Sequence, residues 1–355
     1  MTPFDSPDFD AHEAVHFFHD PACGLEVIIA IHSSALGPGA GGCRYWRYDT
    51  RRAGLTDALR LSRGMSYKNA LADLPFGGGK AVILKSDRQT DRRAVFEVFG
   101  RFVESLGGTY ITAEDVGTRV EDMRSIARMT RYVSGLVSEH GVAGGDPSPK
   151  TAYGVFLGLR ETWRHVSGTD DLAGVRVAVQ GLGGVGGHLC RHLHESGATL
   201  VVADLNAELV ERFVRDFGAT AVAAEEILRA DVDILSPCAL GAVLNATTIP
   251  NVRARAVVGG ANNQLATDAD GLALMMGGIT YAPDYVVNAG GIISVASEYL
   301  GSGSEEEVRR KIERIPVTLR AILERARESQ QPTATVADRL ARERIAAGRK
   351  SVAAA

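Results

Sequence analysis

The chain has 355 residues, and this length predicts two domains because a single hydrophobic core seldom grows beyond about 250–300 residues. The net charge of −4 is dispersed along the sequence, which argues against a nucleic-acid partner. No apolar run is long enough to cross a membrane, and residues 1–17 lack the apolar core of a signal peptide. Four widely separated cysteines fit reduced thiols without metal-ligand spacing. We therefore expect a soluble cytoplasmic protein without a bound metal.

In the first part of the chain, strands and helices are separated by glycine-rich loops at 37–42 and 75–80. Helical spacing of apolar residues begins near Thr56, which we expect to be the N-cap of its helix. Residues 141–149 have the composition of a hinge or interdomain loop. The predicted strands are 24–31, 81–84 and 109–112, and the predicted helices are 55–72, 91–106 and 117–127.

After a helix predicted at 151–165, the pattern becomes regular, with short apolar strands separated by stretches long enough for helical crossovers. This alternation predicts a parallel sheet built from right-handed βαβ units. The chain beyond Ser304 is charged and amphipathic, which indicates helices. The predicted strands are 175–180, 200–204, 233–236, 256–260 and 279–282.

The sequence GLGGVG at 181–186 lies between a predicted strand and a helix at 188–196, the context that makes a GxGxxG motif meaningful. Gly181 permits the tight turn, Gly183 lets the backbone approach a diphosphate, and Gly186 lets the helix pack close to the strand. The helix N-terminus favours the negative charge of the diphosphate. These features predict a dinucleotide site.

Asp204 ends the strand that follows this motif. A carboxylate at this position accepts hydrogen bonds from the ribose hydroxyls and repels a 2′-phosphate, which predicts NAD rather than NADP. The alternative is a solvated acid at a strand end, and the surrounding motif makes that interpretation the weaker one.

Two lysines and one aspartate are the candidates for chemistry. Lys68 and Lys80 lie in stretches of small, uncharged residues, where burial favours the neutral amine over the ammonium. A P-loop at Lys80 is excluded because Leu74 and Ala81 occupy the positions of a required glycine and a serine or threonine. Asp115 follows a short strand, and the residues leave open whether it acts in chemistry or as a helix N-cap.

Seven segments, in order along the chain, resemble the family of glutamate, leucine, phenylalanine and valine dehydrogenases. The resemblance is closest to its leucine-specific members, through TAEDVG and DPSPKTAYGV. The segments are GGCR (41–44), RLSRGMSYKNALADLPFGGGK (60–80), YITAEDVG (110–117), DPSPKTAYGV (146–155), GLGGVG (181–186), GGANNQL (259–265) and APDYVVNAGGIISV (282–295).

This resemblance implies two α/β domains with the active site in the cleft between them. The first would be a substrate-binding and oligomerisation domain, residues 1–144 with a returning C-terminal helix at 325–355. The second would be a Rossmann-type NAD-binding domain at 145–324. The resemblance also implies a homo-oligomer.

The same resemblance implies a role for each candidate. Lys68 would bind the α-carboxylate of an amino acid, Lys80 would assist the attack of water on an imino carbon, and Asp115 would transfer protons to and from the amino group. Substrate-binding residues would be Lys68, Ala40, Gly41, Gly42, Met65, Ala113, Asn262, Asn288, Ile292 and Val295. Coenzyme-binding residues would be Gly181, Gly183, Gly184, Val185, Gly186, Asp204, Thr151, Cys238, Ala239 and Asn262.

Glutamate-specific members carry a lysine where this chain has Ala40, so a buried γ-carboxylate would have no partner here, at a cost of several kcal/mol. We therefore expect NAD-dependent oxidative deamination of an apolar L-amino acid, with leucine, valine and isoleucine as first choice. An aromatic amino acid such as phenylalanine is the alternative substrate. A catalytically silent NAD-binding regulatory protein is an alternative of another class, although it would have no reason to keep Lys68, Lys80 and Asp115.

Overall fold

The computed structural model describes residues 2–136, 146–301 and 303–353. Its contacts divide the chain into two compact units. Unit 1 comprises Met1–Gly145, Val295–Glu305 and Ala341–Ala355, and unit 2 comprises Asp146–Ser294 and Glu306–Leu340. The domain boundary expected at residues 144–145 lies outside the described residues. Within the described part of the chain, no helix has the length and apolar character needed to cross a membrane.

Unit 1 contains a mixed sheet with the strand order β1-β2-β5-β3-β6, in which β4 also pairs with β5. The pairs β1–β2 and β2–β5 are antiparallel, whereas β3 and β4 run parallel to β5 along successive parts of its length. Gly41 and Gly42 join these two short strands. The strands are β1 (Ala14–Asp20), β2 (Leu25–Ser33), β3 (Gly39–Ala40), β4 (Cys43–Trp46), β5 (Gly77–Leu84) and β6 (Tyr110–Ile111).

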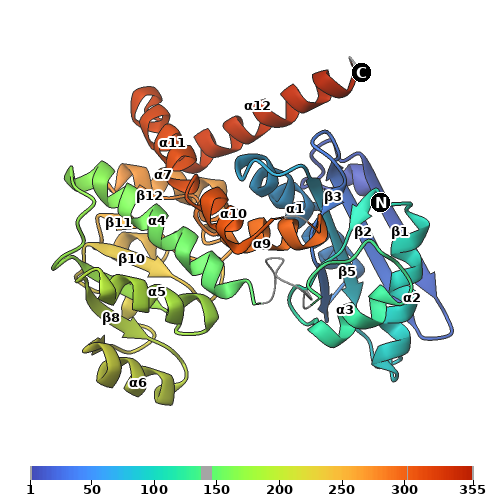
Figure 1. Ribbon diagram of the computed structural model, residues 1–355, viewed down its shortest axis with the longest axis horizontal. Coiled ribbons are helices and arrows are strands. Elements are labelled where there is room, and N and C mark those ends of the chain that lie inside the picture. Colours follow the sequence, from blue (N-terminus) through green and yellow to red (C-terminus); the bar gives the residue numbers. More distant parts are fainter. Residues whose placement is uncertain (1, 137–145, 302, 354–355) are drawn as a thin grey trace. The chain divides into compact units, whose positions relative to one another are not determined.

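Helices cover both faces of this sheet because its central strands are buried on both sides. Ala58 and Leu59 of α1 (Arg51–Leu71) pack against Val82, while Phe96 of α2 (Arg92–Ser105) packs with Ile83 on the other face. α3 (Val120–Ala127) packs beside α2 (Figure 1). A 3-10 turn, η1 (Pro3–Asp5), precedes β1.

Two helix starts differ from the sequence prediction. The N-cap of α1 is Thr50, whose side chain accepts a hydrogen bond from the Ala53 amide, so Thr56 lies inside the helix. The N-cap of α3 is Arg119, and the Asp115 side chain is therefore not a helix cap.

Unit 2 is built on a fully parallel sheet with the order β12-β11-β10-β7-β8-β9. The first strand of the unit, β7, lies in the middle with β8 on one side and β10 on the other. This reversal of strand order is the switch point at which doubly wound sheets bind dinucleotides. The Rossmann-type prediction is confirmed. The strands are β7 (Arg176–Gln180), β8 (Thr199–Ala203), β9 (Thr220–Ala221), β10 (Ile234–Pro237), β11 (Ala256–Val257) and β12 (Thr280–Tyr281).

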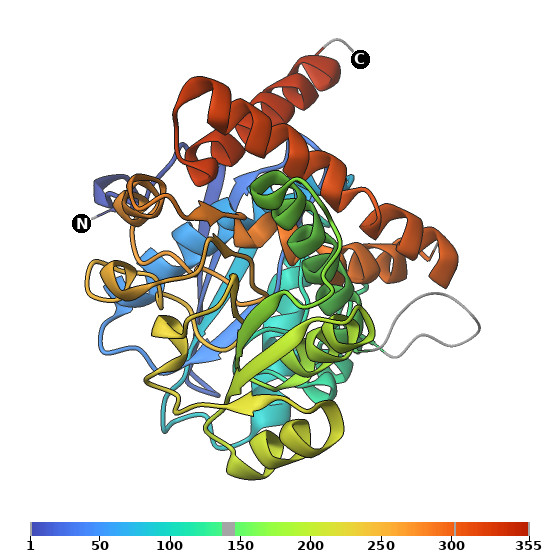
Figure 2. The ribbon, with the colours of Figure 1, turned by 90° about the vertical axis from the view of Figure 1, so that its left-hand side faces the viewer.

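Helices α4 and α5 lie side by side in unit 2, and α6 packs against β8 and β9 at the sheet edge (Figures 1 and 2). Short 3-10 turns, η2 (Ile227–Arg229) and η3 (Ile249–Asn251), connect the later strands. The helices are α4 (Ser148–Ser167), α5 (Gly184–Glu195), α6 (Ala207–Phe217), α7 (Asp268–Met276) and α8 (Asp284–Val287).

The C-terminal helices are shared between the units. α9 (Gly290–Tyr299) and α12 (Thr333–Ala353) each contribute residues to both, and residues 325–340, expected in the first domain, belong to unit 2. Within unit 1, Arg344 of α12 donates to the carbonyls of Ala70 and Leu71 at the C-terminus of α1. The remaining helices are α10 (Glu305–Ile312) and α11 (Ile315–Ser329).

Candidate active site

Strand alternation brings the predicted lysine and aspartate of unit 1 to one face of the sheet. Val82 of β5 packs with α1, so Lys80, two residues earlier, points to the same face. Arg44 is the register partner of Val82 and shares that face. Asp115 follows β6, whose chain continues beside β4 through the bridge between Cys43 and Glu114. The mixed register therefore gathers these side chains beneath α1.

A buried ion pair is the central feature of this face. The Lys80 Nζ lies 2.9 Å from Asp115 Oδ2, and Lys80 is only 5% exposed. Arg44 Nε donates to the same carboxylate oxygen at 3.0 Å. Burial acts to raise the pKa of Asp115, but the charges of Lys80 and Arg44 outweigh it and lower the pKa from 3.8 to about 2. Asp115 is consequently a carboxylate at neutral pH.

Lys68 is carried by α1, which packs unusually close to β5. A Cβ built on Gly78 would lie 2.1 Å from Ser66 Oγ, so only glycine permits this approach. Asn69 reinforces it by donating from Nδ2 to the Gly77 carbonyl at 2.6 Å. Lys68 lies between Ser66 and Asn69 in the sequence and is half-buried. The contacts of these two neighbours with β5 fix the position of the helix that carries Lys68.

The predicted apolar lining of unit 1 surrounds the same part of the sheet. Ala40 is buried and pairs with Gly78 and Ile111, and Gly42 follows it on the same face. Ala113 accepts the Cys43 amide hydrogen bond and adjoins this position. A Cβ on Gly41 would lie 3.0 Å from Met65 Cγ, so Met65 of α1 covers this glycine. The residues that flank the Lys80–Asp115 pair here carry no charge.

Arg44 received no role from the sequence, although it belongs to the GGCR segment. The position of the Arg44 side chain depends on the register of β4 against β5. If that pairing were known, the alternation from Gly42 to Arg44 would indicate the sheet face on which Arg44 lies. Its guanidinium contacts Asp115 and, through Nη1, Asp57 of α1 at 2.9 Å.

In unit 2, the glycine-rich turn has the geometry that its motif predicts. Gly181 has φ +91°, and a Cβ there would lie 2.9 Å from the Ala239 Cβ. A Cβ on Gly186 would lie 1.9 Å from the Gly181 carbonyl oxygen, so α5 packs tightly on the turn. Gly183 and Gly184 are exposed, and a Cβ on Gly183 would meet no atom within 4 Å. The start of α5 is therefore open to a ligand on its outer side.

The carboxyl ends of the neighbouring strands supply the rest of this surface. Asp204 accepts from the Leu182 amide at 2.6 Å and from the Asn206 amide at 2.8 Å, one hydrogen bond to each oxygen. Cys238 lies against the turn and accepts a hydrogen bond from the Gly260 amide, and Val185 lies close to the same glycine. Because each carboxylate oxygen has two lone pairs, Asp204 retains capacity for a further donor.

Two exposed leucines flank the turn and were not singled out from the sequence. Leu205, just after β8, is 90% exposed, and Leu240, just after β10, is 74% exposed. The two side chains therefore place exposed apolar surface on both sides of the strand β7 that leads into the turn. The sequence could have indicated these two residues, because each leucine follows the end of a predicted or observed strand, after Asp204 or Ala239, where polar turn residues are usual.

The predicted residues Thr151, Asn262 and Asn288 also gather within unit 2. Asn288 Nδ2 donates to Asn262 Oδ1 at 2.9 Å. A Cβ on Gly291 would lie 2.6 Å from Thr151 Oγ1, which places the start of α9 against α4. Asn288 is 4% exposed, and its Oδ1 has no hydrogen-bond partner within the described residues. Ile292 and Val295 follow three residues apart on one face of α9.

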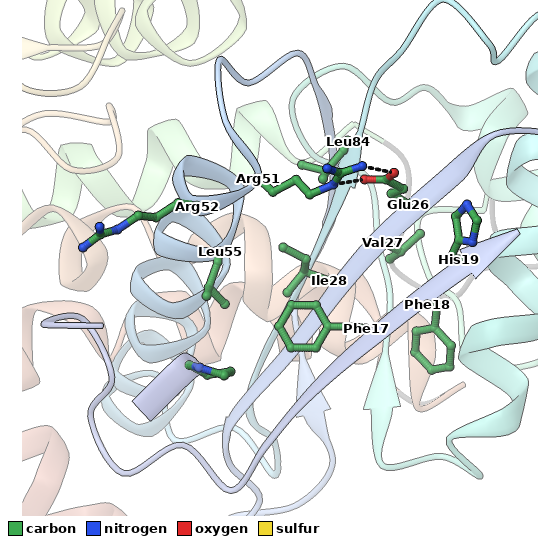
Figure 3. Close-up of a pocket in the computed structure, with 11 residues that line it drawn as sticks. Phe17, Phe18, His19, Glu26, Val27, Ile28, Arg51, Arg52, Leu55 and Leu84 are labelled. Atoms are coloured by element: carbon green, nitrogen blue, oxygen red, sulfur yellow. Dashed lines mark hydrogen bonds and ion pairs between the residues drawn. The ribbon is translucent and has the colours of Figure 1, made fainter. Parts of the chain in front are cut away.

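A groove of about 470 Å³ on unit 1 is separate from these residues (Figure 3). Phe17 of β1 and Ile28 of β2 line it, and the ion pair of Arg51 with Glu26 stands at its margin. None of its lining residues belongs to the Lys80–Asp115 cluster. Among the described residues, no group of three or more His, Cys, Asp or Glu side chains is arranged to hold a metal ion.

A parallel dinucleotide-binding sheet in one unit and a buried lysine–carboxylate pair in the other define an oxidoreductase of the dinucleotide-binding class. The family model for the Glu/Leu/Phe/Val dehydrogenase dimerisation domain matches residues 12–132. The model for glutamate/leucine/phenylalanine/valine dehydrogenase matches residues 146–212 and 203–352. The chain therefore belongs to this family, as its motifs indicated, and it is an amino-acid dehydrogenase, dependent on a pyridine nucleotide, that acts on the CH–NH2 group.

Several relatives span nearly the whole chain. Leucine dehydrogenase of Geobacillus stearothermophilus is 48% identical over 340 residues, covering 96% of this chain and 92% of that enzyme. Valine dehydrogenase of Streptomyces virginiae is 46% identical, covering 96% of each chain. The crystal structure of L-tryptophan dehydrogenase from Nostoc punctiforme superposes with a TM-score of 0.85 at 43% identity, covering 96% of this chain and 97% of that one. The relatives thus share the reaction class but differ in the amino acid.

Proposed function

We propose that this protein catalyses the reversible oxidative deamination of an apolar L-amino acid with NAD⁺. The reaction converts L-amino acid, NAD⁺ and water to 2-oxo acid, NH₄⁺, NADH and H⁺. The observation that carries the proposal is the buried Lys80 held 2.9 Å from Asp115, on a sheet face where the small, uncharged Ala40 and Gly78 are paired. A cation and a carboxylate in contact, sheltered from water, are suited to stabilising developing negative charge and moving protons.

This scheme gives a distinct task to each of the three charged candidates in unit 1. Lys68, on the rigidly packed α1, binds the α-carboxylate and thereby orients the substrate Cα. Lys80 stabilises the oxyanion that forms when water adds to the imino carbon. Asp115, ionised because Lys80 and Arg44 depress its pKa, accepts a proton from the amino group and returns one in the reverse direction.

The turn between β7 and α5 fits NAD. Gly183, where a Cβ would meet no atom within 4 Å, leaves the α5 N-terminus open for the diphosphate, and Asp204 is placed for the ribose hydroxyls. The exposed Leu205 and Leu240 would cover the adenine. A bound nicotinamide ring would supply the acceptor for the hydride from the substrate Cα. We assign Thr151, Asn262 and Asn288 to the nicotinamide end, where the unpartnered Asn288 Oδ1 offers an acceptor.

The substrate side chain should be apolar. Ala40, Ala113 and Met65 flank the lysine–carboxylate pair without offering a charge to a side-chain carboxylate. Leucine, valine and isoleucine are our first choice, supported by the leucine and valine dehydrogenases among the relatives. An aromatic side chain is the alternative, favoured by the small Ala40 and by the tryptophan dehydrogenase relative.

We further propose that the protein acts as a homo-oligomer through unit 1. Strand β1 is an edge strand, and its Phe17 is 58% exposed beside the groove of Figure 3. The family model that matches this region is that of a dimerisation domain. Light scattering of the purified protein measures the assembly state, and a monomer at micromolar concentration contradicts this part of the proposal.

The experiment that tests the function is a survey of the 20 common L-amino acids with NAD⁺ and NADP⁺, following the absorbance of the reduced coenzyme. The proposal predicts turnover of leucine, valine and isoleucine with NAD⁺ and little or none of glutamate. Turnover restricted to aromatic substrates supports the alternative assignment. A preference for glutamate, or for NADP⁺, contradicts the proposal.

A further inference from the structure

The Lys80–Asp115 pair is part of a longer chain of charged side chains that runs from the sheet to α1. Arg44 Nε donates to Asp115 Oδ2 at 3.0 Å, and Arg44 Nη1 donates to Asp57 Oδ2 at 2.9 Å. The Tyr48 hydroxyl donates to the same Asp57 oxygen. One guanidinium therefore bridges two carboxylates that come from different elements of unit 1.

The hydrogen bonds at Asp115 are divided unequally between its two oxygens. Oδ2 receives both Lys80 and Arg44, whereas Oδ1 receives no hydrogen bond from any described residue. Because both cations approach one oxygen, they fix the rotation of the carboxylate and leave the other oxygen able to accept a proton. A single lysine on a flexible stem would not define this orientation, whereas the planar guanidinium directs its N–H groups rigidly.

The Arg44 guanidinium is itself held in place by Asp57, a second carboxylate besides Asp115. Its side chain is 22% exposed, and burying a guanidinium is costly unless carboxylates compensate its charge. Asp57 and Asp115 provide that compensation from opposite ends, and together they raise the pKa of Arg44 although burial acts to lower it. Removing Asp57 would leave Arg44 free to swing around Asp115, so Asp57 anchors the guanidinium to α1.

We propose that Arg44 is a positioning residue of the deamination reaction, which orients the Asp115 carboxylate from β4 while Asp57 on α1 holds the guanidinium. This inference rests on the proposed function, because it requires Asp115 to transfer protons. The competing interpretation is purely structural: Arg44 would only fasten α1 to the sheet. The two interpretations differ in what the loss of Arg44 does to a correctly folded enzyme.

The test compares Arg44→Gln, Arg44→Lys and Arg44→Ala with the wild-type protein, using L-leucine and NAD⁺ and normalising to the folded fraction from circular dichroism. Arg44→Gln should lower kcat at least about 10-fold, a part of the ~10²–10⁴ that an acid–base group contributes. The KM values for leucine and NAD⁺ should stay close to wild type. Arg44→Lys should recover part of kcat because it restores a cation beside Asp115. Added guanidinium should raise kcat of Arg44→Ala.

Arg320→Gln is the matched control, since Arg320 forms a bidentate ion pair with the buried Glu161 in unit 2. Its kcat should be near wild type and should not respond to guanidinium. Wild-type kcat in Arg44→Gln overturns the proposal, as does a loss that neither lysine nor guanidinium recovers. The Asp115→Asn variant distinguishes a failure of the proposed function from a failure of the role assigned to Arg44. Normal kcat in that variant contradicts the proposed function, whereas impaired Asp115→Asn beside normal Arg44→Gln contradicts only the role of Arg44.

Discussion

Replacing Asp115 by asparagine keeps the shape of the side chain but removes its charge from a site that two cations share. Lys80 is almost completely buried, so the variant leaves its ammonium beside a neutral amide. Lys80 and Arg44 would then repel each other without the carboxylate between them. The structure therefore predicts a loss of stability in addition to a loss of activity.

The magnitude follows from the pKa of Asp115. Burial raises it and the two cations lower it, from 3.8 to about 2, a difference equivalent to about 2 kcal/mol of stability at neutral pH. Because the folded-state pKa is depressed, this contribution is complete above the ordinary value of 3.8 and is lost as the pH falls toward 2. Asp115→Asn should thus lower the free energy of unfolding by about 2 kcal/mol between roughly pH 5 and pH 7, and the difference should shrink below about pH 4.

Urea denaturation of the wild-type and Asp115→Asn proteins, followed by circular dichroism at several pH values, measures this difference. Lys80→Met and the double variant complete a thermodynamic cycle. Residues in one ion-pair network should couple by about 0.5–3 kcal/mol. Equal unfolding free energies for wild type and Asp115→Asn at pH 7, or a coupling energy of zero, would refute the inference that this ion pair is formed in solution.

Three further substitutions test the separate parts of the site. Asp204→Ala should narrow the ratio of kcat/KM for NAD⁺ over NADP⁺, because the carboxylate no longer repels a 2′-phosphate; an unchanged ratio would place the discrimination elsewhere. Lys68→Ala should raise the KM for the amino acid much more than it lowers kcat, and the opposite pattern would contradict its role in binding. Ala40→Leu should reduce kcat/KM for phenylalanine about 5- to 30-fold more than for leucine, because a rigid ring cannot repack around the added branch. An unchanged ratio of the two substrates would show that position 40 does not contact the side chain.

The dinucleotide turn could be predicted from the sequence because its geometry depends on near neighbours. A strand, three spaced glycines and a helix specify one local shape, and Asp204 directly follows the next strand of the same βαβ unit. The sequence also predicts β2 from a continuous run of apolar residues and α1 from apolar residues at helical spacing. The sequence predicts too late a start for α1 because Thr50 and Thr56 are both acceptable caps, and only the position of the first packed turn decides between them.

Features that depend on pairing between distant segments could not be predicted from the sequence. Strand β1 reads AVHFFHD, in which polar and aromatic residues obscure the alternation of an edge strand. Strand β9 is only two exposed residues and has no apolar signal. The residues themselves single out Lys80 and Asp115 as candidates, and the family resemblance implies their roles. The contacts of Arg44 with Asp115 and with Asp57, however, arise from the register of β4 and β5 and from the packing of α1. No local pattern encodes those contacts.

In the proposed reaction Lys80, buried against Asp115, carries out chemistry rather than coenzyme binding. The most direct test is kcat for the deamination of L-leucine by Lys80→Met, measured together with the dissociation constant for NADH from fluorescence. Methionine keeps the length and apolar stem of lysine while removing its charge. We expect kcat to fall by a factor of at least about 10², with the affinity for NADH unchanged. A near-normal kcat in a variant that still binds NADH would contradict this expectation.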